Sequence, residues 1–386
     1  MIDNVTWSTK KLGDIAKLQY GKAKPKSSSK HGTVPFYGSG GIDGFTNEKF
    51  VEKDAIIIGR KGSVGSIYYA KNSSWPLDTA YYTFGSENVN LKFLYYLLPN
   101  VPFVNMDTVK PGLNREYAES IEIKLPNLEY QNNVVKNLDI FERKVLNIEK
   151  LEQLLTNYIT KIFEHYFLDF NIIKNDTVNL VKKGRLTSKV PEIWDVQNFY
   201  QNSLFTINTQ SVKPFEGSKR YVDTRSIHNN SINNFEFTNY EEKKSRANLE
   251  VKENSILFAK MTNSVKHYFF MENSKKIIDN SIFSTGFINI VPNEDSFEYV
   301  AALTMNSYFE KRKNNIGSAK TSQQAINNDE LKLIDLIIPD KKSLETFKKL
   351  TTIHFKKLES IRNEKMEIKD VQNKLTRHII DGTISL

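Results

Sequence analysis

Cysteine is absent from this chain of 386 residues. Its absence excludes a disulfide framework, a thiolate zinc site, an iron–sulfur cluster and a cysteine nucleophile. No run approaches the roughly 18 uninterrupted apolar residues of a membrane helix, and the N-terminal segment has no apolar signal core. The sequence therefore favours a cytoplasmic protein without a membrane segment. It should have two or three domains, because domains average roughly 150 residues.

Catalytic signatures are missing as well. The glycine-rich segments 38–44 and 59–65 match neither a dinucleotide-binding fingerprint nor a phosphate-binding loop. The Asn-Pro-Pro-Tyr and Asp-Pro-Pro-Tyr tetrapeptides of adenine methyltransferases do not occur, and the six histidines lack the spacing of a zinc-peptidase helix. We expect a binding protein that is not an enzyme and that uses no cofactor and no metal.

The excess of positive charge is modest and is not gathered in a tail. The chain has 54 Lys and Arg residues against 45 Asp and Glu residues, a formal net charge of +9. Such a balance favours a polyanionic partner only weakly. Residues 15–42 are more informative, because they contain five lysines and no acid.

The chain contains two diverged copies of one unit. Residues 56–64 and 256–264 each form an apolar run followed by a polar turn and then an aromatic cluster, and residues 121–126 match residues 334–339. The spacing between equivalent residues is wider at Pro126 and Pro339 than at Trp7 and Trp194, so the second copy contains insertions. A repeat at this scale predicts two similar domains in one chain.

Each copy is predicted to be a mixed α/β domain of short strands, so the fold class is α+β. The expected strands are Ala55–Ile58, Ser66–Ala70, Ala80–Phe84 and Ile121–Leu125 in the first copy, and Ser255–Ala259, His267–Met271, Ser284–Val291 and Lys332–Ile338 in the second. The expected short helices are Leu91–Leu98 and Phe297–Phe309, and the glycine-rich segments 21–32 and 38–44 are expected to be loops.

A long amphipathic helix follows each copy. No Gly or Pro interrupts Leu128–Phe170 or Lys342–Asp381, and Gly382 suits a C-cap. Apolar residues recur every three or four positions, and a helix of about 38 residues is about 57 Å long. We expect the seams Leu138–Ile162 and Phe347–Leu375 to pack antiparallel as a coiled coil. The alternative is that each helix packs only on its own domain.

These patterns define the expected domain organisation. Residues 1–127 form the first domain, residues 128–187 the central long helix and a linker, residues 188–341 the second domain, and residues 342–386 the C-terminal long helix.

Basic and polar loops at equivalent positions of the two copies are the candidate binding site. Lys and Arg side chains hold DNA phosphates, and polar side chains read base edges. Arg60 follows an apolar strand in the first copy, and Lys260 is its equivalent in the second. The residues expected to contact DNA are Lys22, Lys24, Arg60, Lys61, Ser63 and Arg115 in the first domain, and Lys213, Lys260, Asn263, Lys320, Thr321 and Gln323 in the second.

The motifs resemble a known family. Trp7 opens Trp-x₄-Leu-Gly-Asp-Ile, Gly-Arg-Lys-Gly-Ser-Val-Gly follows at 59–65, and a Leu-Pro leads into Glu-Tyr-Gln and a long helix. This order, partly repeated in the second half, resembles the specificity subunit of type I restriction–modification enzymes. The second copy departs from it, because Leu-Gly-Asp-Ile does not follow Trp194 and the turn lacks its glycines.

The resemblance implies a function for the whole chain. Two target recognition domains would each read one half of a bipartite, asymmetric sequence in double-stranded DNA. The antiparallel helices would set the distance between the half-sites and dock methyltransferase subunits, of which we expect two. Motor–nuclease subunits could join the complex. Two alternatives remain open from the residues: a protein-binding scaffold with incidental basic loops, and an enzyme with methyltransferase activity of its own.

Overall fold

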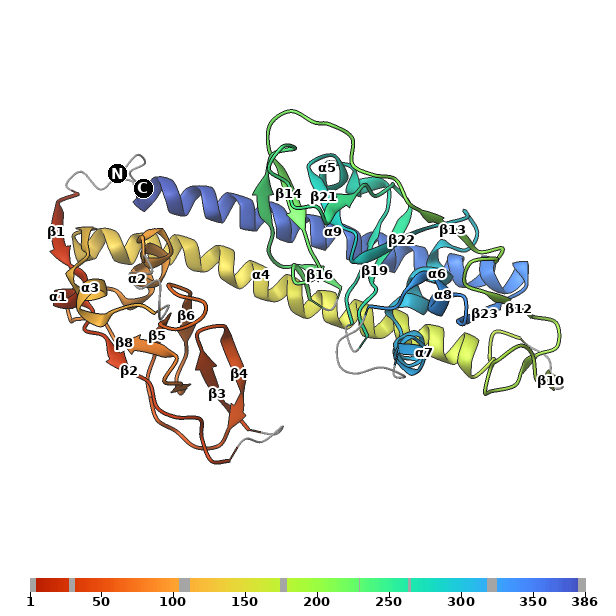
Figure 1. Cartoon of the computed structure of the whole chain (residues 1–386), viewed down its shortest axis with the longest axis horizontal. Helices are drawn as coiled ribbons and strands as arrows, with labels where there is room; N and C mark the ends of the chain where they lie inside the picture. The colour runs from red at the N-terminus through yellow and green to blue at the C-terminus, as the bar shows by residue number, and fades with distance from the viewer. Residues whose placement is uncertain are drawn as a thin grey trace. The chain divides into compact units, whose positions relative to one another are not determined.

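A computed structural model describes residues 5–27, 32–103, 112–173, 179–228, 230–262, 265–317 and 325–380. The chain divides into two compact units (Figure 1): one comprises Met1–Lys144 and Ile368–Leu386, and the other comprises Val145–Glu367. The helices α4 (Leu128–Phe163) and α9 (Lys341–Ile380) contribute residues to both units. No helix in the described ranges is long and apolar enough to cross a membrane.

The first unit is built from short strands and short helices. Its strands are β1 (Trp7–Lys11), β2 (Gln19–Tyr20), β3 (Val34–Gly38), β4 (Gly41–Thr46), β5 (Ala55–Gly59), β6 (Ile67–Ala70), β7 (Trp75–Pro76), β8 (Ala80–Thr83) and β9 (Glu122–Pro126). Its short helices are α1 (Leu12–Ile15), α2 (Leu91–Leu97), η1 (Leu98–Asn100) and α3 (Arg115–Ser120).

The second unit has more strands. They are β10 (Leu180–Val181), β11 (Val190–Pro191), β12 (Asp195–Asn198), β13 (Phe205–Asn208), β14 (Lys219–Val222), β15 (Ile227–His228), β16 (Ser231–Ile232), β17 (Glu236–Thr238), β18 (Ala247–Leu249), β19 (Ser255–Ala259), β20 (His267–Phe270), β21 (Ser281–Ser284), β22 (Phe287–Pro292) and β23 (Asp335–Ile338). Its short helices are the π-helical η2 (Glu164–Leu168), then η3 (Glu272–Ser274), α5 (Lys275–Asp279), α6 (Phe297–Met305), α7 (Ser307–Gly317) and α8 (Asn328–Leu331).

The topology confirms the internal repeat. The main sheet has the antiparallel order β2-β8-β5-β6 in the first unit and β13-β22-β19-β20 in the second. A smaller sheet accompanies each: β3 pairs antiparallel with β4 and parallel with β7, and β14 pairs antiparallel with β17 and parallel with β21. Strand β18 extends the smaller sheet of the second unit only.

The central strand of each main sheet carries the core. Every residue of β5 and of β19 is buried, as expected for apolar strands that are covered on both faces. A helix covers one face in each unit through aromatic contacts: Tyr95 of α2 packs on Tyr69 of β6, and Phe297 of α6 packs on Phe269 of β20. Equivalent elements therefore bury equivalent faces.

The first and last strands of each copy pair with each other and lead into a long helix. Strand β1 pairs antiparallel with β9, and β12 pairs antiparallel with β23. One polar residue follows each pair and accepts backbone hydrogen bonds at the helix start: Asn127 from Tyr130 at 3.0 Å and Asp340 from Ser343 at 3.1 Å. These caps begin α4 and α9 at matched positions.

The long helices confirm the predicted antiparallel seam. In the second unit, Tyr158 of α4 packs on His354 of α9 with ring centroids 4.8 Å apart, and Phe163 packs on Phe347 at 6.4 Å. Residue numbers rise along α4 as they fall along α9, so the helices run in opposite directions (Figure 1). In the first unit, Leu375 of α9 packs against the core cluster that contains Leu138.

Some sequence expectations need correction. Segment 38–44 is not a loop, because β3 and β4 form a hairpin there, and its tip is allowed by Gly41 at φ +104°. Segment 297–309 is two helices, because α6 ends at Met305 and α7 begins at Ser307. The α-helical part of 128–170 ends at Phe163. The expected C-cap Gly382 lies outside the described residues.

Candidate nucleic-acid interface

Two arginines share one exposed aromatic ring in the first unit. The Arg60 guanidinium lies 5.0 Å from the Tyr20 ring centroid, and that of Arg115 lies 5.3 Å from it. Tyr20 ends β2 and is 48% exposed. Arg60 follows β5 and Arg115 begins α3, so the fold gathers residues that are far apart in the sequence. A cation–π contact leaves a guanidinium charged and restrains its position over the ring.

The backbone fixes Arg60 firmly. Its N–H donates to the carbonyl of Thr79 at 2.9 Å, and its carbonyl accepts from the N–H of Leu113 at 2.8 Å. Its Nη1 donates to the carbonyl of Asp78 at 3.0 Å. The side chain is thus held in one orientation, which lowers the entropy that a contact with a ligand would cost.

Lys22 and Lys24 also lie on aromatic rings. The Lys22 ammonium is 3.9 Å from the Phe50 ring centroid, and the Lys24 ammonium is 4.9 Å from that of Phe36. Lys24 is also 3.4 Å from an oxygen of Asp43, and both side chains of this ion pair are more than half exposed. Exposed pairs of this kind are weak and can be exchanged for a phosphate.

Lys61 and Ser63 are exposed on the glycine turn after β5. Gly62 and Gly65 both have φ +74°, and a Cβ on Gly59 would lie 2.1 Å from the carbonyl oxygen of Ser63. The glycines are therefore needed to close the turn. Close turns also bring backbone N–H groups near a bound anion.

The second unit repeats the hydrogen-bond pattern of Arg60 at Lys260. The N–H of Lys260 donates to the carbonyl of Gly286 at 2.9 Å, and its carbonyl accepts from Ile326 at 2.9 Å. The next residues match too, because Met261 bridges Ala325 as Lys61 bridges Gly112. Burial lowers the pKa of the Lys260 ammonium. The equivalence of Arg60 and Lys260 is thus a property of the backbone as well as of the sequence.

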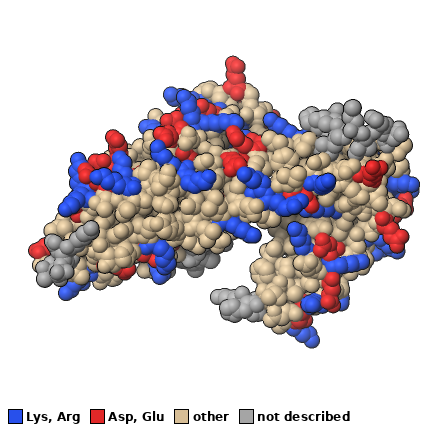
Figure 2. Space-filling view, turned by 180° about the vertical axis from the view of Figure 1, so that it is seen from behind, with Lys and Arg blue, Asp and Glu red and all other residues tan. Residues whose placement is uncertain are grey.

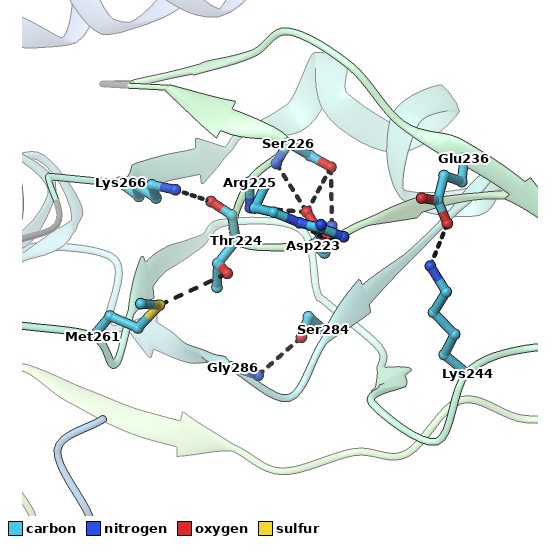
Figure 3. A network of polar contacts seen from close by, with 10 residues as sticks. All are labelled: Asp223, Thr224, Arg225, Ser226, Glu236, Lys244, Met261, Lys266, Ser284 and Gly286. Carbon is cyan, nitrogen blue, oxygen red and sulfur yellow. Dashed lines mark hydrogen bonds and ion pairs between the residues drawn. The ribbon is translucent and has the colours of Figure 1, made fainter. Parts of the chain in front are cut away.

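A polar network adjoins the Lys260 turn (Figure 3). Asp223 follows β14 and accepts from Arg225 Nε at 3.0 Å and Nη2 at 2.8 Å, and from the backbone N–H of Ser226 at 3.0 Å. Burial by itself would raise the pKa of Asp223, but these hydrogen bonds outweigh it and hold the pKa below its ordinary value. Lys266 donates to the carbonyl of Thr224, and burial lowers its pKa.

Arg225 and Lys266 are candidate contact residues that the sequence did not single out. The Arg225 side chain is 78% exposed although its guanidinium is paired with Asp223. The hydroxyl of Thr224 lies 4.0 Å from the sulfur of Met261, which joins the network to the turn. The order Asp-Thr-Arg-Ser at 223–226 was the available signal, because Asp caps its own turn in such segments.

The remaining predicted residues divide into two groups. Lys213 is exposed in the irregular segment between β13 and β14. Asn263, Lys320, Thr321 and Gln323 lie outside the described residues. On the face shown in Figure 2, Lys and Arg are interspersed with Asp and Glu and form no continuous basic surface. In the first unit, the candidate contacts lie just after β2, on the turn after β5 and at the start of α3.

The comparisons with known proteins agree with this architecture. The family model for the type I restriction modification DNA specificity domain matches residues 4–157. A type I restriction enzyme specificity subunit from Haemophilus influenzae is 29% identical over 143 residues, which cover 35% of this chain and 37% of that protein. The MjaIX specificity subunit from Methanocaldococcus jannaschii is 22% identical over 219 residues, which cover half of each protein.

A solved structure matches almost the whole chain. The S subunit of the type I restriction–modification system from M. genitalium covers 97% of this chain and 96% of its own, with a TM-score of 0.54 and 14% sequence identity. At this identity the likeness establishes the fold. The chain spans half or less of the length of the two curated relatives above.

Proposed function

We propose that the chain is the DNA-recognition subunit of a type I restriction–modification system, because residues 4–157 match the family model for the type I restriction modification DNA specificity domain. Each of its two repeated domains reads one half of a bipartite, asymmetric target in double-stranded DNA. The subunit itself is not catalytic, and it needs no cofactor. Residues 1–127 and 188–341 are the recognition domains, and the long helices are the spacer between them.

One observation carries this proposal: both copies present a cation on the same backbone frame. Arg60 and Lys260 follow the buried central strand, and each makes the same pair of backbone hydrogen bonds to two neighbouring segments. Side chains around the two residues differ, as expected if the copies read different sequences. The same backbone arrangement with different side chains is expected of two domains that recognise different half-site sequences.

The long helices support docking of two copies of one partner. Ile140 and Ile353 occupy equivalent positions of the repeat, and they are 58% and 67% exposed. Tyr158 and Val371 are equivalent in the same way, and each is 50% exposed. Exposed apolar residues at matched positions of a helix pair favour a repeated protein interface. We propose that two methyltransferase subunits dock there, and that motor–nuclease subunits can join them.

DNA binding by the purified chain with its methyltransferase partner tests the proposal. Affinity for duplex DNA should fall steeply with salt, by about 0.9 log units per phosphate contact for each log unit of salt. Methylome sequencing of a host that carries the gene and its partners should reveal one bipartite motif. Salt-insensitive or absent DNA binding, together with an unchanged methylome, would favour a protein-binding adaptor instead.

A further inference from the structure

Three charged residues are buried in the seam between the long helices. Glu152 of α4 and Arg362 and Lys365 of α9 are 6%, 1% and 1% exposed. Arg362 Nε donates to Glu152 Oε1 at 2.9 Å, and Lys365 Nζ donates to Glu152 Oε2 at 2.8 Å. Glu149 lies one turn before Glu152, and its Oε1 is 4.0 Å from Lys365 Nζ. All four residues belong to the second unit.

The repeat relates these residues to one another. Pro126 and Pro339 precede the long helices at equivalent positions of the repeat. The same number of residues separates Glu152 from Lys365 and Glu149 from Arg362, so these pairs are equivalent too. In an antiparallel pair of equivalent helices, equivalent residues face each other only at the midpoint. Glu152 contacts its own equivalent, so the cluster marks the midpoint of the helix pair. The first copy supplies only acids there, and the second copy supplies only bases.

The two basic residues of the cluster, Arg362 and Lys365, also contact their own domain. The Arg362 guanidinium lies 4.7 Å from the Phe269 ring centroid and 5.2 Å from that of Tyr268, both on β20. Its Nη1 and Nη2 are buried without a hydrogen-bond partner in the part of the chain that is described. Lys365 donates to the hydroxyl of Ser231 on β16 as well as to Glu152. The two cations are therefore also held by contacts with their own domain.

Such a cluster discriminates between helix partners. Two α4 helices paired in the same manner would place Glu149 and the buried Glu152 against the same acids, and two α9 helices would bury Arg362 and Lys365 against the same bases. Buried like charges repel strongly, and a buried charge without its counterion is costly. A single buried polar group is known to fix register and partner choice in coiled coils.

We propose that the midpoint cluster, formed by Glu149, Glu152, Arg362 and Lys365, is a pairing code. By this we mean that its complementary charges make α4 pair with α9 and exclude pairing of like helices between two chains. Every assembly then contains one copy of each recognition domain. This consequence for the DNA target rests on the proposed function, whereas the pairing itself does not. The partner that the code selects is the other half of this chain.

A charge exchange in the full chain tests the code. The variants Glu152→Lys and Lys365→Glu should each lower the unfolding temperature by about 10 °C, because each breaks a buried pair. The double variant E152K/K365E restores an ion pair between positions 152 and 365 but leaves the new lysine beside Arg362, so it should recover part of the loss. The control Gln153→Lys adds a charge on the exposed face of α4 and should have little effect. If neither single variant folds, recovery of folded protein in the double variant gives the same answer.

Mixing the two single variants tests partner choice without DNA. At positions 152 and 365 the E152K chain has two bases and the K365E chain has two acids, so each chain is mismatched within itself at this pair and matched to the other. Refolded together, they should form a one-to-one heterodimer by size-exclusion chromatography with light scattering, and neither should dimerise alone. The code is overturned if the double variant is no more stable than the single ones, or if the mixture contains no heterodimer. Neither result depends on DNA binding, so failure of the proposed function remains distinguishable.

Discussion

At the scale of single residues, Arg60 is the side chain on which the DNA-binding proposal depends most. It is fixed by its backbone, by Asp78 and by the Tyr20 ring. Replacing Arg60 with Ala should weaken binding to the target by about 1–3 kcal/mol if it reads a base, with a smaller loss on random DNA. An equal loss on both DNAs would indicate a phosphate contact.

Equilibrium binding to target and random duplexes measures this difference. Arg60→Lys is the matched control, because it keeps the charge and loses the guanidinium that lies over the Tyr20 ring. A variant R60A that binds both DNAs like the wild type removes Arg60 from the interface.

The buried Glu152 should make the free energy of unfolding depend on pH. Burial by itself would raise its pKa, but the charges of Arg362 and Lys365 outweigh burial, and the pKa lies below the ordinary value. A carboxyl group whose folded pKa is lowered contributes stability above its unfolded pKa and loses that contribution as pH falls through the folded pKa. Unfolding in denaturant between about pH 7 and pH 3 should show this loss, and Glu152→Gln should remove that part of it. An unchanged pH profile in Glu152→Gln would mean that folding does not lower the pKa of Glu152.

The sequence singled out some candidate contact residues because the repeat marks them. Arg60 and Lys260 follow matching apolar runs, so comparison of the copies found both. Tyr20 and Arg225 were missed, since their roles depend on neighbours that only the fold brings close. An exposed aromatic ring has no local signature, and the turn signature of residues 223–226 does not indicate which side chain could bind a ligand.

At the scale of elements, the start of α9 combines a helix cap with a buried side-chain hydrogen bond. Asp340 caps the helix and also accepts from the indole N–H of Trp194 at 2.8 Å. Trp194 is fully buried. Replacing Asp340 with Ala should cost about 2–3 kcal/mol, because it removes a cap and leaves a buried N–H without its partner.

The equivalent cap of α4 provides the control. Asn127 accepts from Tyr130 in the same way, but Trp7 of the first copy is only partly buried. Asn127→Ala should therefore cost only about 1 kcal/mol. Denaturant unfolding of both variants measures the difference, and equal losses would show that the Trp194 hydrogen bond contributes little.

The type of an element could be predicted where apolar residues kept a helical spacing over many residues, or where a short run was wholly apolar. The helix spacing of apolar residues predicted α4 and α9, and the apolar runs predicted β5 and β19. The hairpin of β3 and β4 was missed because its glycines are typical of a loop, whereas its strands are stabilised by pairing with each other and with β7. Short strands are decided by such tertiary contacts.

At the scale of the whole molecule, the repeat predicts division of labour between the domains. Exchanging residues 188–341 for those of a related chain should change one half of the methylated sequence and leave the other half unchanged. Exchange of residues 1–127 is the matched control and should change the other half. Methylome sequencing of both chimaeras measures the outcome. A chimaera that alters both halves, or neither, would contradict independent reading.

The helices should act as a spacer whose length sets the gap between half-sites. Inserting seven residues in α4 and seven in α9 preserves the seam and lengthens the pair by about 10 Å. DNA rises about 3.4 Å per base pair, so the gap should grow by about three base pairs. The same edit turns one half-site by about 100° around the duplex, so binding should weaken even on the re-spaced target because protein or DNA must deform.

A shorter insertion that breaks the register should instead expose apolar seam residues such as Leu138 and Leu358, each worth about 1.5–3 kcal/mol when buried. The methylated motif of the edited variants is the measurement: a constant gap in a folded, active variant would mean that the helices do not set the spacing.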